Sequence, residues 1–271
     1  MRKMYWRSKS REIIYRVART REELRQAFSL VYQEYLSRGY IPKHYKSRLR
    51  LSLYNVLPTT TTFVALHANK VVATVTLIPD SPLGIAMDKI YKEEIDGLRR
   101  KGRRVAEVSQ LAIDSKLFPT GWFSMFNFDK LIFLFRLFKI VLDYGLYIEK
   151  LNDFCIAINP KHQYLYKFLG FEELGGLKYY GSVNKALAIA KRLNLDNIED
   201  KAKHRIGLYK IFFGKKIDAG VFENKLQFSI SDLEYFFTKK SDILKKATKE
   251  QLYYIMHCYP KRKINRLREK I

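Results

Sequence analysis

The chain has 271 residues, of which 47% are hydrophobic and 14% aromatic, so it can bury one large core or a core with a smaller appendage. Its 51 Lys and Arg residues exceed its 27 Asp and Glu residues, and the formal net charge of +24 favours polyanionic partners: nucleic acid, anionic lipid or an acidic protein. The most apolar segment, residues 128–148, is broken by Lys130, Arg136, Lys139 and Asp143, which excludes a membrane span in favour of a buried helix.

The cysteines and histidines indicate neither a disulfide framework nor a metal site. Cys155 and Cys258 stand alone in apolar segments, as is typical of proteins in a reducing cytoplasm. The five histidines never recur at the spacing of helical metal ligands. We therefore expect a cytoplasmic protein without a metal, and the positive charge leaves peripheral contact with the inner membrane surface open.

The first half of the chain alternates between strand and helix patterns. After a basic lead at residues 1–12, residues 13–18 predict a strand, and the capping box Thr20-Arg-Glu-Glu23 opens a helix that ends at Gly39. The apolar segments 63–67 and 71–78 predict a β-hairpin, which stops at Pro79-Asp80-Ser81-Pro82. A helix over residues 88–101 then leads to the segment GRRVAEVSQLAID, residues 102–114.

This segment predicts a central strand with a carboxylate in its middle. With regular alternation, one face of the strand carries Val105, Glu107, Ser109, Leu111 and Ile113, and both faces are mostly apolar. An ionised carboxylate there costs free energy unless it is paired, hydrogen-bonded or hydrated, and its pKa tends to rise. Two interpretations follow: Glu107 is a general base, or it is a structural residue that bonds a neighbouring loop or pairs with Arg103 or Arg104.

The remaining patterns complete a mixed sheet and then change character. An apolar helix over 124–144 and a strand over 153–158 finish an α/β fold with a mixed central sheet flanked by helices, over residues 13–181. Beyond it, the segment VNKALAIAKRL and the capping boxes Ser231-Asp-Leu-Glu234 and Thr248-Lys-Glu-Gln251 indicate short helices. We therefore expect a helical C-terminal extension over residues 182–271.

The segment NPKHQYLYKFLGF, residues 159–171, resembles the last motif of the GCN5-related N-acyltransferase fold. Asn159 at the end of a strand is followed by Tyr166 and then by Gly170-Phe171, which is the full spacing of that motif. The resemblance implies that the strand of Glu107 and the strand ending at Asn159 splay apart, and that the pantetheine arm of a thioester donor fills the gap. Unpaired backbone groups there would bind the arm and polarise the thioester carbonyl.

Two longer segments, FSLVYQEYLSRGY and TVTLIPDSPLGIAMDKIYKEEIDGLRRKGRRVAEVSQLAID, resemble the N-acyl amino acid synthase family, which is related to the acyl-homoserine-lactone autoinducer synthases. The resemblance covers about residues 14–195. It implies an N-acyltransferase that moves a long fatty acyl chain from acyl carrier protein to the α-amino group of an amino acid. The EVSQL core is similar to the Glu-x-Ser-Arg of the autoinducer synthases, but Gln110 stands where they have Arg, which argues against a homoserine-lactone product.

CoA-dependent members of the fold carry a Gln/Arg-x-x-Gly-x-Gly/Ala loop after the Glu107 strand, where N–H groups at a helix N-terminus hold the pyrophosphate. The corresponding segment, SKLFPTGWFSMFNFDK, lacks this motif. We therefore expect acyl carrier protein, which is acidic, as the donor and partner, and no bound cofactor apart from the phosphopantetheine arm of that donor. Basic residues expected to flank the entrance for this arm are Lys161, Lys167, and Arg103 or Arg104.

The resemblance implies catalytic roles for Glu107, which would accept a proton from the acceptor ammonium, and Tyr166, which would protonate the leaving thiolate. The candidate substrate-binding residues are Asp80 for the acceptor ammonium, Ser109 for the acceptor carboxylate or for Glu107 itself, and Asn159. Ordinary structural roles are the alternatives: a packed tyrosine, a satisfied buried serine and an aspartate in a turn. The phenylalanines at positions 126, 128, 133, 135 and 138 either wall an acyl-chain pocket or belong to the core.

Two other functions stay open at this point. A CoA-dependent N-acetyltransferase or an autoinducer synthase would differ in its use of acyl-CoA against acyl carrier protein. A non-catalytic basic protein that binds nucleic acid or membrane has only the charge in its favour, because no nucleic-acid-reading motif is present, so nucleic acid is the less favoured partner.

Overall fold

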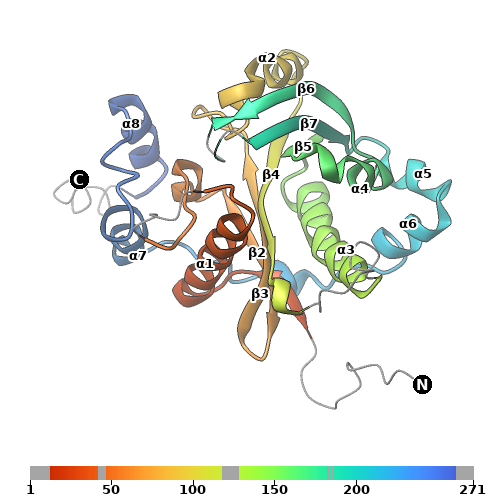
Figure 1. Ribbon diagram of the computed structural model, residues 1–271, viewed down its shortest axis with the longest axis horizontal. Helices are drawn as coiled ribbons and strands as arrows, with labels where there is room; N and C mark the ends of the chain where they lie inside the picture. Colours follow the sequence, from red (N-terminus) through yellow and green to blue (C-terminus); the bar gives the residue numbers. More distant parts are fainter. Residues whose placement is uncertain (1–12, 42–46, 118–127, 182–183, 185, 261–271) are drawn as a thin grey trace.

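A computed structural model describes residues 13–41, 47–117, 128–181, 184 and 186–260. Its centre is a seven-stranded sheet in the order β1-β2-β3-β4-β5-β7-β6 (Figure 1). The strands are β1 (Ile14–Val17), β2 (Thr61–His67), β3 (Lys70–Pro79), β4 (Val105–Ile113), β5 (Asp153–Ile158), β6 (Glu172–Tyr180) and β7 (Ala186–Asn194). All neighbouring pairs are antiparallel except β4 and β5, which are parallel. The predicted mixed sheet is confirmed.

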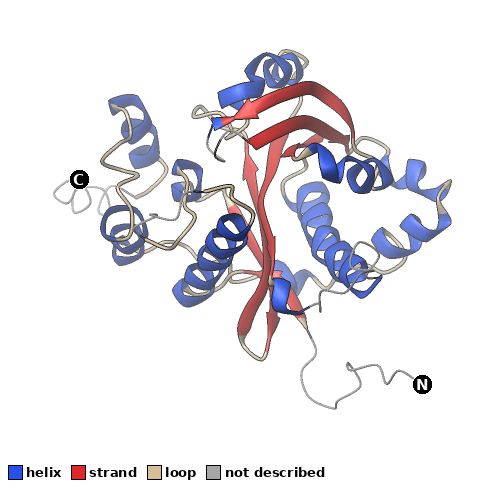
Figure 2. Ribbon diagram, viewed as in Figure 1, coloured by secondary structure: helices blue, strands red, loops and turns tan. Residues whose placement is uncertain are grey.

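Helices cover both faces of this sheet (Figure 2). On one face lie α1 (Arg21–Ser37) and α2 (Asp88–Arg99), and on the other lie α3 (Phe128–Asp143) and α4 (Gln163–Phe168). The buried apolar side chains of α1, α2 and α3 each belong to a separate cluster against the sheet. The resulting helix–sheet–helix layers are those of the predicted α/β fold.

Local signals account for the ends of several elements. The Thr20 hydroxyl accepts a hydrogen bond from the Glu23 amide at 3.2 Å and caps α1, and Gly39, with φ of +71°, follows the end of that helix. The β2–β3 turn places Ala68 and Asn69 at φ of +51° and +61°, as a tight hairpin turn requires. Both elements were predicted from the sequence.

The predicted regular alternation along β4 is wrong beyond Ser109. Gln110 has φ of +53° and sits in a bulge, because Ser109 pairs with Thr76 while Ala112 pairs with Thr74. The extra residue rotates the end of the strand. Leu111 and Ile113 therefore pack in the α3 cluster with Ala106 and Val108, on the face opposite to Glu107.

The segment 183–193, expected to be helical, instead contributes most of β7. Strand β7 pairs with β5 on one side and β6 on the other. Alanine-rich sequence favours a helix intrinsically, but hydrogen bonding to two strands and burial of Ala188 and Ala190 override that preference. The sheet therefore extends to Asn194, past the expected boundary at residue 181.

The helices after β7 pack on both faces of the sheet. They are α5 (Ile198–Lys203), α6 (Ile206–Phe212), α7 (Ile230–Glu234) and α8 (Lys249–His257). Leu208 of α6 joins the α3 cluster, whereas Leu233 of α7 and Ile255 of α8 join the α1 cluster. The chain crosses between the faces beside β1, where the Leu226 amide donates to the Ala18 carbonyl at 3.0 Å.

Two capping predictions in this region have different outcomes. The Thr248 box is confirmed, since Thr248 and Gln251 exchange side-chain to backbone hydrogen bonds at the start of α8. The Ser231 box is wrong by two residues, because α7 is capped by Ser229 together with Asp232. Turns of π-helix follow α3 (Tyr144–Ile148) and α7 (Tyr235–Lys239). Within the described ranges, every helix is too short or too polar to cross a membrane.

Candidate active site

Strands β4 and β5 are paired at one end only. The parallel ladder joins Val105 to Asp153, Ala106 to Phe154 and Glu107 to Cys155, and it stops there although β4 runs to Ile113 and β5 to Ile158. Over its remaining length β5 pairs with β7 alone. The predicted V-shaped opening between the two strands is confirmed. Backbone N–H and C=O groups that face the opening are available to a ligand.

The closed end of the opening is held by a buried ion cluster. Asp153 is fully buried and contacts Arg103, and its second oxygen lies 3.2 Å from Nε of Arg192. Arg103 also pairs with Asp196 at 2.9 Å. Because Arg103 is committed to this cluster, it is not the partner of Glu107, and the ion-pair interpretation of Glu107 with Arg103 is wrong.

Glu107 occupies the last paired position before the strands part. Its side chain is 3% exposed, and its Oε2 accepts a hydrogen bond from the Met87 amide at 2.8 Å. Burial raises the pKa of Glu107 to about 7, while the Met87 amide and the Ser109 hydroxyl oppose the rise and the Asp88 charge adds to it. A carboxylate that titrates near neutral pH at this point can take a proton from a substrate and release it again.

Ser109 lies two residues further along β4 and is half-buried. Its hydroxyl hydrogen-bonds the Glu107 carboxylate and lowers the pKa of that group.

Tyr166 lies on α4, on the other side of the opening. Its ring packs edge-on against Phe138 and Phe171, with centroid distances of 6.1 and 5.4 Å, and burial raises its pKa well above the usual range. The next cause of this rise is the hydroxyl of Tyr35, on α1. Burial also raises the pKa of Tyr35, and the charge of Glu107 adds to that rise. Tyr35 therefore interacts electrostatically with both Glu107 and Tyr166.

Sequence reasoning missed Tyr35 as a site residue. It stands at a regular position of the apolar face of α1, where a tyrosine is indistinguishable from a packing residue. Its hydroxyl becomes a candidate site group through its interactions with Glu107 and Tyr166, which arise only in the folded chain.

Asn159 directly follows β5 and caps the short helical turn Pro160–His162. Its Oδ1 accepts a hydrogen bond from the Lys161 amide at 3.0 Å. The chain then enters α4, and Gly170, with φ of +92°, ends it. This geometry explains the spacing of the 159–171 segment: Asn159 opens the helical turn that places Tyr166 at the opening.

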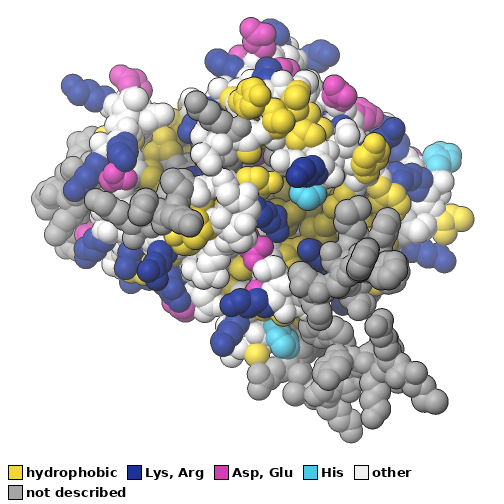
Figure 3. Space-filling model, in the orientation of Figure 1, with side chains coloured by type: hydrophobic (Ala, Val, Ile, Leu, Met, Phe, Trp, Pro, Cys, Tyr) yellow, Lys and Arg dark blue, Asp and Glu magenta, His cyan; other side chains and the backbone are white. Residues whose placement is uncertain are grey.

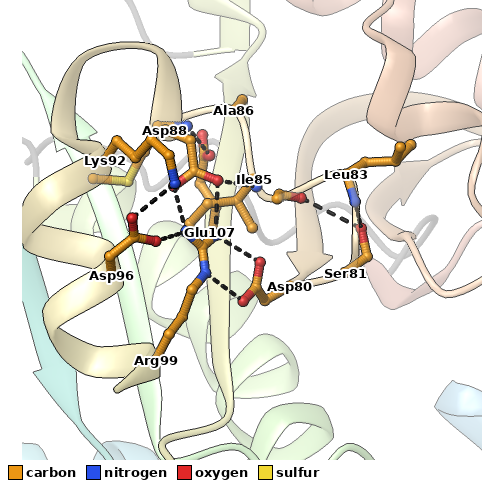
Figure 4. Close-up of polar contacts among 12 residues, drawn as sticks. Asp80, Ser81, Leu83, Ile85, Ala86, Asp88, Lys92, Asp96, Arg99 and Glu107 are labelled. Carbon is orange, nitrogen blue, oxygen red and sulfur yellow. Dashed lines mark hydrogen bonds and ion pairs between the residues drawn. The ribbon is translucent and has the colours of Figure 1, made fainter. Parts of the chain in front are cut away.

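Asp80 has a different partner from the one expected. Both of its carboxylate oxygens accept hydrogen bonds from Arg99, each at 2.7 Å, and Arg99 also binds Asp88 and Asp96 (Figure 4). The cluster draws α2 against the end of β3. The Asp80 oxygens are thus engaged with protein rather than presented to an acceptor ammonium.

The aromatic helix is core in the part that the structure describes. Phe133, Phe135 and Phe138 are at most 6% exposed and contact Tyr15, Phe168 and Tyr166, respectively. The structure does not describe Phe126 or the side chain of Phe128. Most of the segment 115–130, whose sequence lacks the pyrophosphate-binding motif, also lies outside the described residues. Among the residues that are described, none form a group of three His, Cys, Asp or Glu able to hold a metal ion.

Comparisons with known proteins agree with this geometry. The family model for the N-acyl amino acid synthase FeeM matches residues 26–194. The solved structure of FeeM, an N-acyl amino acid synthase from uncultured soil microbes, is similar with a TM-score of 0.60 and 30% identity, over 71% of this chain and 95% of that one.

A second solved structure supports the fold. The acyl-homoserine-lactone synthase LasI is similar with a TM-score of 0.52 and 13% identity, over 77% of this chain and 98% of that one. Comparison with curated proteins finds no significant match. The family match and the FeeM structure together establish that this chain belongs to the FeeM family of N-acyl amino acid synthases and is an N-acyltransferase.

Proposed function

We propose that the enzyme transfers a long-chain fatty acyl group from the thioester of acyl carrier protein to the α-amino group of an amino acid, with Glu107 as general base. The observation that carries this proposal is a buried carboxylate with a pKa of about 7 where β4 and β5 part. The opening would hold the pantetheine arm, and Glu107 would face the acceptor from its closed end.

In this mechanism Glu107 accepts a proton from the acceptor ammonium, and the free amine attacks the thioester carbonyl carbon. Backbone N–H groups left unpaired along the opening would stabilise the resulting oxyanion. The C–S bond then breaks as the amide forms. Tyr166 protonates the sulfur, directly or through a water molecule, and the remaining extra proton on the nitrogen passes by the same route to the resulting Tyr166 phenolate. Glu107 then releases its proton to solvent and is ready for the next turnover.

Two arginines near the site suit an amino-acid acceptor. Arg50 and Arg38 both lower the pKa of Tyr35, so both cations act on the phenol that interacts with Glu107 and Tyr166. An α-amino acid brings a carboxylate next to its amine, and a guanidinium binds a carboxylate in a favourable planar geometry. We assign these two residues as candidates for holding the acceptor carboxylate; Arg38 also pairs with Glu34 at 3.2 Å, so Arg50 is the stronger candidate.

The charge of the protein supports an acidic donor. In the space-filling view Lys and Arg side chains are spread over the whole visible face (Figure 3). Lys161, just before α4, and Lys167, in the last turn of α4, follow the end of β5 where the two strands are apart, and both are exposed. Arg104 is exposed as well, but it precedes β4 at the closed end of the opening. Arg103 is less suited to contact a partner, because it is engaged with Asp153 and Asp196.

The test compares matched acyl carrier protein and acyl-CoA donors over a salt series. We expect the carrier protein to have the larger kcat/KM, and its advantage to shrink with salt, because the Debye length falls from about 10 Å at 0.1 M to about 3 Å at 1 M. Equal constants for both donors would favour a CoA-dependent enzyme. Binding of DNA without acyl transfer would favour the non-catalytic alternative.

A further inference from the structure

The loop that binds Glu107 is held at both ends by one arginine. Residues 80–88 connect the end of β3 to the start of α2, and within them the Met87 amide donates to Glu107 at 2.8 Å. Arg99, in the last turn of α2, donates to both oxygens of Asp80, each at 2.7 Å, and to those of Asp88 at 3.0 and 2.7 Å (Figure 4). Because Asp80 begins the loop and Asp88 ends it, a single guanidinium joins the two ends.

The inside of the loop is tight and depends on the same aspartate. Oδ2 of Asp88 accepts a hydrogen bond from the Ile85 amide at 2.8 Å. Gly84 has φ of +70°, and a Cβ built there would lie 2.0 Å from Oδ2 of Asp88, so only glycine fits without displacement. The position of the Met87 amide is therefore coupled to Asp88, and that of Asp88 to Arg99.

Helix α2 is attached to the sheet independently of Arg99. The Tyr91 hydroxyl lies 2.9 and 2.7 Å from the carbonyl oxygens of Gly176 and Ala188, and Lys178 donates to Glu94 at 2.6 Å. These contacts hold the helix on β6 and β7. The contacts of Arg99 with Asp80 and Asp88 thus act mainly on the loop.

We propose that Arg99 is a positioning residue for the reaction: through Asp80 and Asp88 it fixes the loop that presents the Met87 amide to the Glu107 carboxylate, and it neutralises Asp88 beside that carboxylate. This inference rests on the proposed function, in which Glu107 is the base. Arg99 touches neither substrate nor Glu107 in this arrangement and acts through the loop.

The groups around Glu107 determine how removal of Arg99 should change the pKa of Glu107. The groups that act on Glu107 or on which its charge acts are the Met87 and Ala86 amides of the loop, Ser109 on β4, Asp88 on α2, Tyr35 on α1, Tyr54 in the turn at Leu53–Val56, and Cys155 on β5. Loss of Arg99 would loosen the Met87 hydrogen bond, which lowers the pKa of Glu107, and expose the Asp88 charge, which raises it. Both effects move the pKa upward.

The experiment titrates Glu107 directly by carbon NMR of glutamate-labelled full-length protein without substrate, with Glu107→Gln identifying the resonance. For Arg99→Gln we expect the Glu107 pKa to rise by about one unit, and turnover at pH 7 to fall several-fold and recover at higher pH. For Asp88→Asn we expect the opposite shift, because the amide oxygen can still bind the Ile85 amide while the negative charge is gone. The matched control is Asp96→Asn, which removes the charge of an Arg99 ion pair outside the loop and should leave the titration unchanged.

If Arg99→Gln and Asp88→Asn both lower Tm and both move the Glu107 pKa in the same direction, the two substitutions act by loosening the fold in general. This result would overturn the proposal. An unchanged Glu107 titration in Arg99→Gln would also overturn it. If Arg99→Gln does not fold, Arg99→Lys takes its place. A lysine keeps the positive charge but cannot form two hydrogen bonds with each of the two carboxylates, so we expect a smaller rise in the Glu107 pKa. The titration needs no turnover, so it stands even if Glu107→Gln proves fully active and the proposed base is wrong.

Discussion

Glu107 and Cys155 form the last pair of the β4–β5 ladder, and the strands separate directly after them. The carboxylate thus lies at the closed end of the opening, buried in the sheet yet next to β4 and β5 backbone that has no strand partner on the side of the opening. This position explains both its raised pKa and its access to a substrate in the gap.

Replacing Glu107 by Gln should stabilise the fold while it removes activity. The pKa of Glu107 is raised in the folded state, so the folded protein binds the proton more tightly than the unfolded chain, and stability falls as pH rises from about 4.5 to about 7. Glu107→Gln lacks this loss, and we expect it to be more stable than the parent by about 1–3 kcal/mol at pH 7. Denaturant unfolding at pH 5 and pH 7 measures the difference, which should be small at pH 5. A difference that does not grow with pH would contradict the buried, titrating carboxylate.

Tyr166→Phe should lower kcat on the order of 10- to 100-fold, because the Tyr166 hydroxyl is proposed to protonate the leaving thiolate. KM and stability should change little, because that hydroxyl has no hydrogen-bond partner among the described residues. The control is Tyr144→Phe, whose hydroxyl accepts from Thr61 at 3.2 Å in the core. That variant should lose about 1 kcal/mol of stability and keep its kcat. Steady-state kinetics and denaturant unfolding of both variants separate the two roles. Unchanged kcat in Tyr166→Phe would leave this tyrosine a packing residue.

Amines that lack a carboxylate should be poor acceptors. Comparing an accepted amino acid with its decarboxylated amine isolates the contribution of Arg38 and Arg50, and we expect kcat/KM to fall about 10- to 100-fold for the amine, the range of a lost charged hydrogen bond. Arg50→Gln should reduce this preference mainly through the acceptor KM. Equal use of both acceptors by the parent enzyme would show that the carboxylate is not recognised.

The sequence predicted most of the sheet and the burial of Glu107 within it, because both depend on the local alternation of residues along the strands. The complete spacing of the 159–171 segment indicated the fold. The sequence did not predict β6 or β7. The helix-favouring alanine segment of β7 is held as a strand by pairing with β6 on one side and, on the other, with β5, which is remote in the chain, as in Asp153 opposite Asn194. The bulge at Gln110 was also missed. Its backbone is stabilised by contacts remote in sequence, including the mutual hydrogen bonds between the Gln110 and Asn55 amides at 3.0 and 3.1 Å.

The site residues divide along the same line. Glu107 was identifiable because a carboxylate in an apolar strand is conspicuous, whereas Tyr35 was not, since a tyrosine on an apolar helix face is ordinary. The partner of Asp80 was missed because Arg99 is 19 residues away and reaches back along α2. Ion pairs that depend on how a helix docks leave no periodic signal in a sequence.

Acyl transfer with Glu107 as general base is tested most directly by incubating the purified enzyme with long-chain acyl thioesters of acyl carrier protein and a mixture of amino acids. N-acyl amino acids are then detected by mass spectrometry. The parent enzyme should form them, and Glu107→Gln should form them about 10² to 10⁴ times more slowly at saturating acceptor, the range for a lost general base. No N-acyl amino acid from the parent enzyme, or near-normal turnover by Glu107→Gln, would contradict the central claim.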